Sequence, residues 1–325
     1  MFRSADADTV KALKKILPAA DWLSDYDKSD VRGDLTAGIT VGVMLIPQSM
    51  AYAMLAGVPP IYGLYAGLVP LVIYALLGTS RHLAIGTASI DMLIVGAGVG
   101  AVAANDAEHI ELAILVAAMA GLIEVGMGVF RFGFMVNFLS RPVIVGFMTA
   151  APLIIAASQL GPLMGVDLPD SQYVHTQVWA AIQNLQQVNV PAVSVGGAGI
   201  VVLLGLEKWK PKWPSSLVWV ALATLVAWGF GLRQEGLEVV GQVPEGWAAL
   251  PSLQMQAWDW SSVQSLGATA LTLALVQFMA VMSLGQAFAS EHGYEVDANR
   301  ELIAIGSSNI VGSFFRSIQI GRAHV

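Results

Sequence analysis

Residues 82–100 read HLAIGTASIDMLIVGAGVG, and this stretch carries the first indication of the fold. Its first five residues favour an extended segment, and an apolar run from Thr87 to Ala104 follows them. The run contains Gly96, Gly98 and Gly100, and glycine disfavours the interior of a helix. A membrane helix needs about 20 mostly apolar residues. The pattern therefore predicts a broken membrane span and not a full transmembrane helix.

Eight or nine apolar runs are separated along the chain by turn or charge signals, and this number predicts an all-α polytopic membrane protein. Only 12% of the 325 residues are charged, where a soluble domain carries about 25%, and 56% are hydrophobic. The runs comprise residues 35–55, 62–77, 87–104, 112–130, 142–164, 191–206, 215–232, 263–289 and 301–315.

Charge and composition exclude several other functions. The net charge is −7 and no basic stripe with interleaved aromatics occurs, so nucleic-acid binding is not expected. The absence of cysteine excludes disulfides, Cys-ligated zinc and a thiol nucleophile. The sequence also has no zinc-protease, serine-hydrolase or Walker motif. We therefore expect no enzyme activity, no cofactor and no metal site.

The basic residues predict the orientation of the chain. When the N-terminus is placed inside the cell, thirteen Lys and Arg fall on the cytoplasmic side and only Arg233 falls outside. Two longer loops, around 106–111 and 165–190, lack Lys and Arg and are placed outside. Residues near Val10, Leu13 and Leu17 suggest a short amphipathic helix on the cytoplasmic face.

Polar residues inside the first apolar run mark a second irregular place. Pro47 removes a backbone donor, and Gln48 and Tyr52, four residues apart, would share one helix face. Irregular backbone at membrane depth survives only when it is buried or lines water. Two interpretations remain open, in which Gln48 either faces a substrate or caps the freed carbonyl groups.

Two carboxyl groups interrupt the apolar runs, Asp91 and Glu124. An Asp at a helix centre costs about 2.5–3.5 kcal/mol on insertion scales, so such residues are functional candidates by default. Asp91 could instead be a protonated carboxyl that hydrogen-bonds within the bundle. Glu124, seven residues from Arg131, is the secondary candidate, and it could simply hydrogen-bond between helices.

Several motifs resemble the SulP family of anion transporters, also called sulfate permeases. The most specific stretch is IPQSMAYA at 46–53 continuing to LAGVPPIYGLY at 55–65. The others are DLTAG at 34–38, FRFGF at 130–134, GFMTAA at 146–151 and ANRELIAIGSSNI at 298–310.

The resemblance implies two inverted seven-helix repeats, divided into a core and a gate, followed by a cytoplasmic STAS domain. Spans three and ten would be half-helices, each preceded by a short strand, with their N-termini facing each other where the anion binds. A helix N-terminus offers free backbone N–H groups and a partial positive charge. The substrate-binding residues implied are Gln48, Tyr52, Thr87, Ala88 and Ser89.

The sequence departs from the family in the eighth span, where Ala280 follows Phe278 and Met279 and replaces the carboxylate of many proton-coupled relatives. Asp91 lies four residues after Thr87, so in a helix both would share a face. A carboxyl next to a bound anion favours protonation, and protonation favours the anion. Asp91 is therefore the predicted coupling residue.

The expected organisation is a cytoplasmic segment at 1–33, the first repeat at 34–232, the start of the second repeat at 233–317 and a non-native tail at 318–325. The last six residues correspond to a translated sequencing-adaptor string, which suggests an artificially truncated reading frame. We expect such a fragment to be inactive by itself.

The resulting functional prediction is secondary transport of a small anion of the sulfate, bicarbonate or dicarboxylate class. The protein would lie in the inner or plasma membrane with its N-terminus in the cytoplasm, and it would form a homodimer when full length. A proton or sodium ion could be the co-substrate. Two alternatives remain, a nucleobase transporter of the same fold and a non-transporting, voltage-responsive membrane protein.

Overall fold

The computed structural model describes residues 17–20, 26–80, 82–138, 141–168, 173–210, 213, 215–239 and 258–322. The amphipathic helix predicted near Val10 lies outside these residues. The chain divides into two compact units, and each is treated by itself. Unit 1 comprises Met1–Ile39, Gln48–Ile144 and Glu245–Val325, and unit 2 comprises Thr40–Pro47 and Val145–Pro244. Unit 1 therefore combines segments of both predicted repeats.

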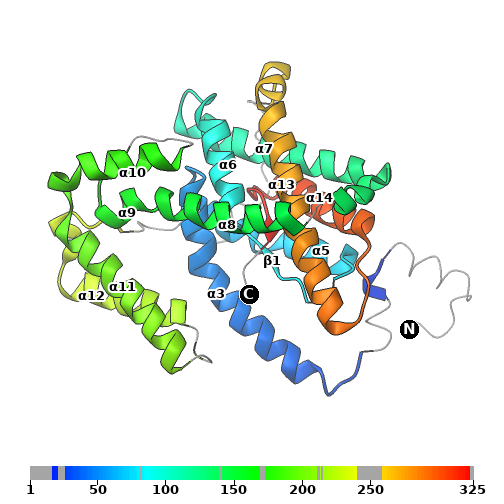
Figure 1. Cartoon of the computed structure of the whole chain (residues 1–325), viewed down its shortest axis with the longest axis horizontal. Coiled ribbons are helices and arrows are strands. Elements are labelled where there is room, and N and C mark those ends of the chain that lie inside the picture. The colour runs from blue at the N-terminus through cyan, green and yellow to red at the C-terminus, as the bar shows by residue number, and fades with distance from the viewer. Residues whose placement is uncertain are drawn as a thin grey trace, which may run out of the picture. The chain divides into compact units, whose positions relative to one another are not determined.

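Unit 1 is a bundle of long and short helices with two very short strands (Figure 1). Helix α14 packs most extensively on α7, and α13 packs on α7 and α6. Leu112, Leu266 and Leu273 are fully buried where these helices meet. Its elements are the two ends of α3 (Val31–Leu55), α4 (Pro60–Ala66), α5 (Val69–Leu77), β1 (Ile85–Gly86), α6 (Ser89–Gly100), α7 (Asp106–Val129), η1 (Phe132–Phe138), α13 (Trp260–His292), α14 (Ala298–Phe314) and β2 (Gly321–Arg322).

Side-chain caps define where three long helices of unit 1 begin. Asn105 accepts from the backbone N–H of Glu108 at the start of α7, and Asp297 accepts from two N–H groups at the start of α14. Asp259 caps α13 in the same way. Hydrogen bonds from Ser262 and Ser261 lower the pKa of Asp259 to about 2, so the cap is ionised at neutral pH.

Glycine allows α7 and α14 to approach closely. A Cβ atom at Gly121 would lie 2.6 Å from the carbonyl oxygen of Gly306, and a Cβ at Gly306 would lie 2.5 Å from that of Gly121. Backbone atoms cannot move aside as a flexible side chain does. Small residues at helix interfaces are typical of membrane bundles, in which close packing replaces the hydrophobic effect between helices.

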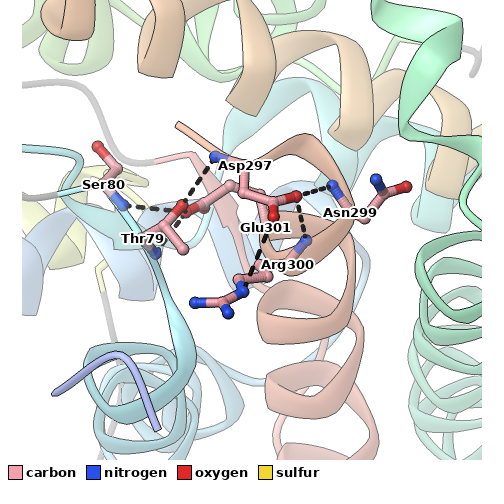
Figure 2. Close-up of polar contacts among 6 residues, drawn as sticks. All are labelled: Thr79, Ser80, Asp297, Asn299, Arg300 and Glu301. Atoms are coloured by element: carbon pink, nitrogen blue, oxygen red, sulfur yellow. Dashed lines mark hydrogen bonds and ion pairs between the residues drawn. The ribbon is translucent and has the colours of Figure 1, made fainter. Parts of the chain in front are cut away.

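The loop after α5 is held to the start of α14 by a carboxylate (Figure 2). Glu301 is buried and accepts hydrogen bonds from the backbone N–H groups of Thr79 and Ser80, at 2.6 and 3.0 Å. The hydroxyl groups of Thr79 and Tyr74 donate to the same carboxylate, at 2.6 and 2.7 Å. These four bonds place the chain that leads into β1.

Unit 2 is also helical, and its described side chains include many exposed apolar groups. Val201, Leu204 and Trp228 are 71%, 63% and 84% exposed, as expected for a surface in contact with lipid. Helix α11 packs on α12 and α9. Besides the middle of α3, the elements are α8 (Arg141–Ser158), α9 (Leu160–Met164), α10 (Val174–Gln183), η2 (Leu185–Gln187), α11 (Val190–Trp209), α12 (Ser215–Gly229) and η3 (Leu232–Glu235).

Among the described residues, five helical segments are long and apolar enough to cross a membrane: Val31–Leu55, Pro60–Leu77, Asp106–Val129, Val190–Trp209 and Trp260–His292. Other predicted runs contain shorter apolar helices, Ser89–Gly100, Pro152–Met164 and Ser215–Gly229.

Pro47 lies inside α3, which runs as one helix from Val31 to Leu55. The predicted run 62–77 falls within the candidate span Pro60–Leu77, in which α4 and α5 separate at Gly67 and Leu68. The predicted outer loop 165–190 contains a helix, α10, because its apolar residues follow helical spacing without forming a long apolar run.

Candidate functional site

The predicted anion-binding residues of the third span lie at the connection between β1 and α6. Ile85 pairs with Arg322 and Gly86 with Gly321 in an antiparallel two-stranded sheet. The chain then stays extended through Ala88, with φ −122° and ψ 137°, and α6 begins at Ser89. The broken span predicted from residues 82–100 is therefore confirmed. The predicted tail contributes β2, and its non-native origin stays a prediction.

The N-terminus of α6 has no side-chain cap. Its first-turn N–H groups, beginning at Ser89, have no partner four residues earlier in the helix. These groups and the helix dipole attract an anion. Thr87 is fully buried, and Ser89 and Ala88 are 5% and 9% exposed, so the terminus lies inside unit 1. This is a suitable environment for holding a small anion without Lys or Arg.

Helix α3 contacts the entry of α6 through the hydroxyl of Ser49. The hydroxyl of Thr87 donates to that of Ser49, at 3.1 Å, which joins the α6 entry to α3. The amide nitrogen of Gln48 donates to the Tyr52 hydroxyl at 3.2 Å, so these two side chains do share one face. Ser49 was missed by sequence reasoning, because a serine in an apolar run gives no distinct signal.

The expected shared face of Thr87 and Asp91 is wrong. The spacing of four residues applies only within a helix, and Thr87 lies before α6 begins. Thr87 contacts α3, whereas Asp91 contacts α13. The two residues are near each other in the chain but reach different helices.

Asp91 belongs to a buried polar network that joins four helices. The amide nitrogen of Gln277 on α13 donates to Asp91 Oδ2 at 3.1 Å and also donates to the carbonyl oxygen of Ile320. Asn309 on α14 donates to Gln277 Oε1 and to Glu124 Oε2 on α7, both at 3.2 Å. The N–H of Ile320 donates to Asn309 Oδ1 at 3.0 Å.

The network brings both sequence-predicted carboxyls together with two amides that the sequence analysis did not select. Asp91 and Glu124 are 2% and 1% exposed, and Gln277 and Asn309 are equally buried. The sequence did offer a signal for Gln277 and Asn309, because each is an amide side chain inside a predicted apolar run. The predicted alternative that Glu124 hydrogen-bonds between helices is confirmed.

The described residues contain no group of three or more His, Cys, Asp and Glu side chains placed to hold a metal ion. The structure therefore brings together an uncapped helix N-terminus and the hydroxyls of Thr87 and Ser49, and it holds a separate buried network of carboxyls and amides. This chemistry suits binding of a small solute within a helical membrane protein.

The chain belongs to the sulfate permease family, whose family model matches residues 31–324. This result confirms the resemblance inferred from the motifs. Members of the family are not enzymes, as predicted. The all-α polytopic class and the inverted-repeat transporter fold are also confirmed.

Two curated relatives and one solved structure show the similarity. The chain is 34% identical over 329 residues to human solute carrier family 26 member 6, covering 94% of this chain and 43% of the relative. It is 35% identical over 294 residues to a probable sulfate transporter of Mycobacterium tuberculosis (strain CDC 1551 / Oshkosh), covering 90% and 52%. The inward-facing structure of the murine anion transporter Slc26a9 is 27% identical with a TM-score of 0.86, covering 100% of this chain and 57% of that one.

The chain thus spans about half the length of the curated relatives that it matches. Family membership and the long apolar helices support an integral membrane protein.

Proposed function

We propose that the chain forms the anion-binding part of a secondary transporter, which carries a small anion by alternating access. The observation that carries this proposal is the buried, uncapped N-terminus of α6, whose entry is joined to α3 by the Thr87–Ser49 hydrogen bond. Inorganic sulfate, bicarbonate and dicarboxylates present the oxygen acceptors that backbone N–H groups bind. The transporter would work as a homodimer in the inner or plasma membrane, with its N-terminus in the cytoplasm.

The substrate class is tested by uptake into liposomes that contain a full-length transporter carrying this sequence. Labelled sulfate, bicarbonate, a dicarboxylate and uracil are compared. We expect saturable uptake of at least one anion and none of uracil. Saturable uracil uptake would favour the nucleobase alternative, and an absence of uptake for every solute, with voltage-dependent charge movement retained, would favour the non-transporting alternative.

Asp91 supports a proposal of proton coupling. It lies in the first turn of α6, where an ionised carboxylate would compete with a bound anion for the helix terminus. Protonation removes this competition, so proton and anion binding would favour each other. Asp91 would then take the role that the missing eighth-span carboxylate has elsewhere in the family.

The coupling proposal is tested by Asp91→Asn in the full-length transporter. The variant mimics the protonated form, so we expect it to keep anion counterflow and to lose accumulation driven by an inward proton gradient. The same assay with a sodium gradient separates the two candidate co-substrates. Accumulation equal to that of the parent protein under the proton gradient would show that Asp91 does not couple transport.

A further inference from the structure

The arrangement of Asp91, Gln277, Asn309 and Glu124 has a consequence beyond the role of Asp91 alone. Each carboxyl has one oxygen that receives an amide N–H, while Asp91 Oδ1 and Glu124 Oε1 are buried without a hydrogen-bond partner. A buried carboxylate oxygen normally finds a donor. A carboxyl that carries a proton on such an oxygen avoids an uncompensated buried charge.

The backbone of Ile320 sets the orientation of both amides. Its N–H needs an acceptor and meets Asn309 Oδ1, while its carbonyl needs a donor and meets the Gln277 amide nitrogen. Asn309 must then turn its nitrogen toward Glu124 and Gln277. If either amide were reversed, two donors or two acceptors would face each other. Any residue at position 320 offers the same two backbone groups.

Among the described side chains, no Lys, Arg or His bonds to Asp91 or Glu124, and the backbone of Gly321 packs directly on the Asp91 carboxyl. Two ionised carboxylates in this setting would repel each other through a medium that screens poorly.

The other titratable residues on the helices packed here lie toward the helix ends. They are Asp106, Glu108, His109 and Glu111 at the start of α7, Glu291 and His292 at the end of α13, and Arg300 and Glu301 at the start of α14. Arg322 follows Gly321 in β2, and its side chain is not among those described, so it enters the test as a control.

We propose that Asp91 and Glu124, linked through the amides of Gln277 and Asn309, form one proton-binding site in which the two carboxyls share their protons. When two carboxyls interact strongly, their protons leave in two separate steps, and each step reflects both residues together. The amide chain keeps both carboxyls at a fixed separation and polarises each toward the other. The inference deepens the coupling part of the proposed function, but it concerns proton binding and not anion transport.

The test is infrared difference spectroscopy of the purified chain in lipid nanodiscs across a pH series. Selective ¹³C labelling of aspartate or of glutamate side chains separates the signals of the two residues. We expect the Asp91 and Glu124 signals to share two protonation steps. Asp91→Asn and Glu124→Gln should each leave a single protonation step. The proton affinity of this step should lie between those of the two parent steps and differ from each by at least threefold.

Gln277→Leu keeps both carboxyls and removes the link, so we expect it to reduce the separation of the two steps by at least about threefold in proton affinity. Ser308→Ala, a buried neighbour of Asn309 that bonds only within α14, is the matched control and should leave both steps unchanged. Arg322→Gln should also leave them unchanged. The central comparison is between the aspartate and glutamate signals of the labelled parent protein, so the test does not depend on every variant folding.

Three results would overturn the proposal. The first is independent titration, in which the Asp91 and Glu124 signals change at unrelated pH values and neither variant affects the other residue. The second is loss of the protonated signal on adding sodium at constant pH, which would assign the site to sodium. The third is a changed titration in Arg322→Gln. A failure of anion uptake in the full-length transporter would leave all these spectra unaffected, so the two proposals fail separately.

Discussion

Single carboxyl groups in unit 1 differ according to what surrounds them. Glu301 receives four hydrogen bonds from the Tyr74–Ser80 segment, so both of its carboxylate oxygens have donors. Asp91 and Glu124 are as well buried, but each has an oxygen without a partner. A fully satisfied carboxylate fixes structure, whereas an unsatisfied one is able to accept a proton.

Glu301→Gln should destabilise unit 1. The change removes the charge that strengthens the bonds from Thr79, Ser80 and Tyr74, and it turns an amide N–H₂ toward one of these donors. We expect a loss of about 1.5–3 kcal/mol in unfolding free energy, measured by denaturant titration in detergent. Glu295→Gln, an exposed residue in the loop before α14, is the control and should change stability little. Equal stability of the two variants would contradict the structural role of Glu301.

Gln48→Leu and Tyr52→Phe test the polar face of α3 in the full-length transporter. Removing one neutral hydrogen-bond partner should weaken anion affinity by about 0.5–1.5 kcal/mol, or up to roughly tenfold. The measurement is the concentration dependence of anion uptake or competition. Unchanged affinity and rate in both variants would show that this face does not line the site.

Among the elements, the most extensive contact is between α7 and α14, which run beside each other in Figure 1. The contact depends on Gly121 and Gly306, whose backbones touch. It also carries the polar network, because Glu124 lies three residues after Gly121 and Asn309 three residues after Gly306. One glycine contact therefore sets the distance across which a carboxyl and an amide meet.

Gly121→Ala should separate α7 from α14. Its Cβ would lie 2.6 Å from the Gly306 carbonyl oxygen, and overpacking of this kind costs about 1–3 kcal/mol. Gly126→Ala on the same helix is the matched control, because no atom lies within 4 Å of its Cβ position. Removing a helical glycine there should stabilise the protein by about 0.5–1 kcal/mol. Thermal unfolding in detergent distinguishes the two, and a stable Gly121→Ala would show that the helices have room to move.

At the scale of the whole molecule, we predict the orientation in the membrane from charge. The basic residues concentrate on the side assigned to the cytoplasm. The cysteine-free sequence allows this assignment to be tested without a background signal, since every introduced thiol is unique.

Gln186→Cys, in η2 just before α11, and Glu207→Cys, in the last turn of α11, place single thiols at exposed positions. We expect a membrane-impermeant maleimide to label position 186 in intact cells and position 207 only after permeabilisation. Both substitutions leave the basic residues in place, so the charge bias is preserved. The reverse labelling pattern would contradict the predicted orientation.

The sequence by itself determined the features that depend on composition and on local chemistry. Low charge and long apolar runs require a membrane environment, and the glycine-rich stretch after residue 86 indicates a broken span wherever the chain folds. The motif residues Gln48 and Tyr52 share a face because helical periodicity alone puts them there. Two buried carboxyls could be selected because an ionisable residue in an apolar run is costly.

Only the tertiary structure decided which of these residues meet. Asp91 and Gln277 are 186 residues apart, and Glu124 and Asn309 are 185 apart, so no local pattern links them. Helix α6 begins at Ser89, after the β1 residues that pair with β2, so Thr87 lies outside the helical face of Asp91. Partner choice across helices is set by close packing and by the need to satisfy buried polar groups, and both act only once distant segments are brought together.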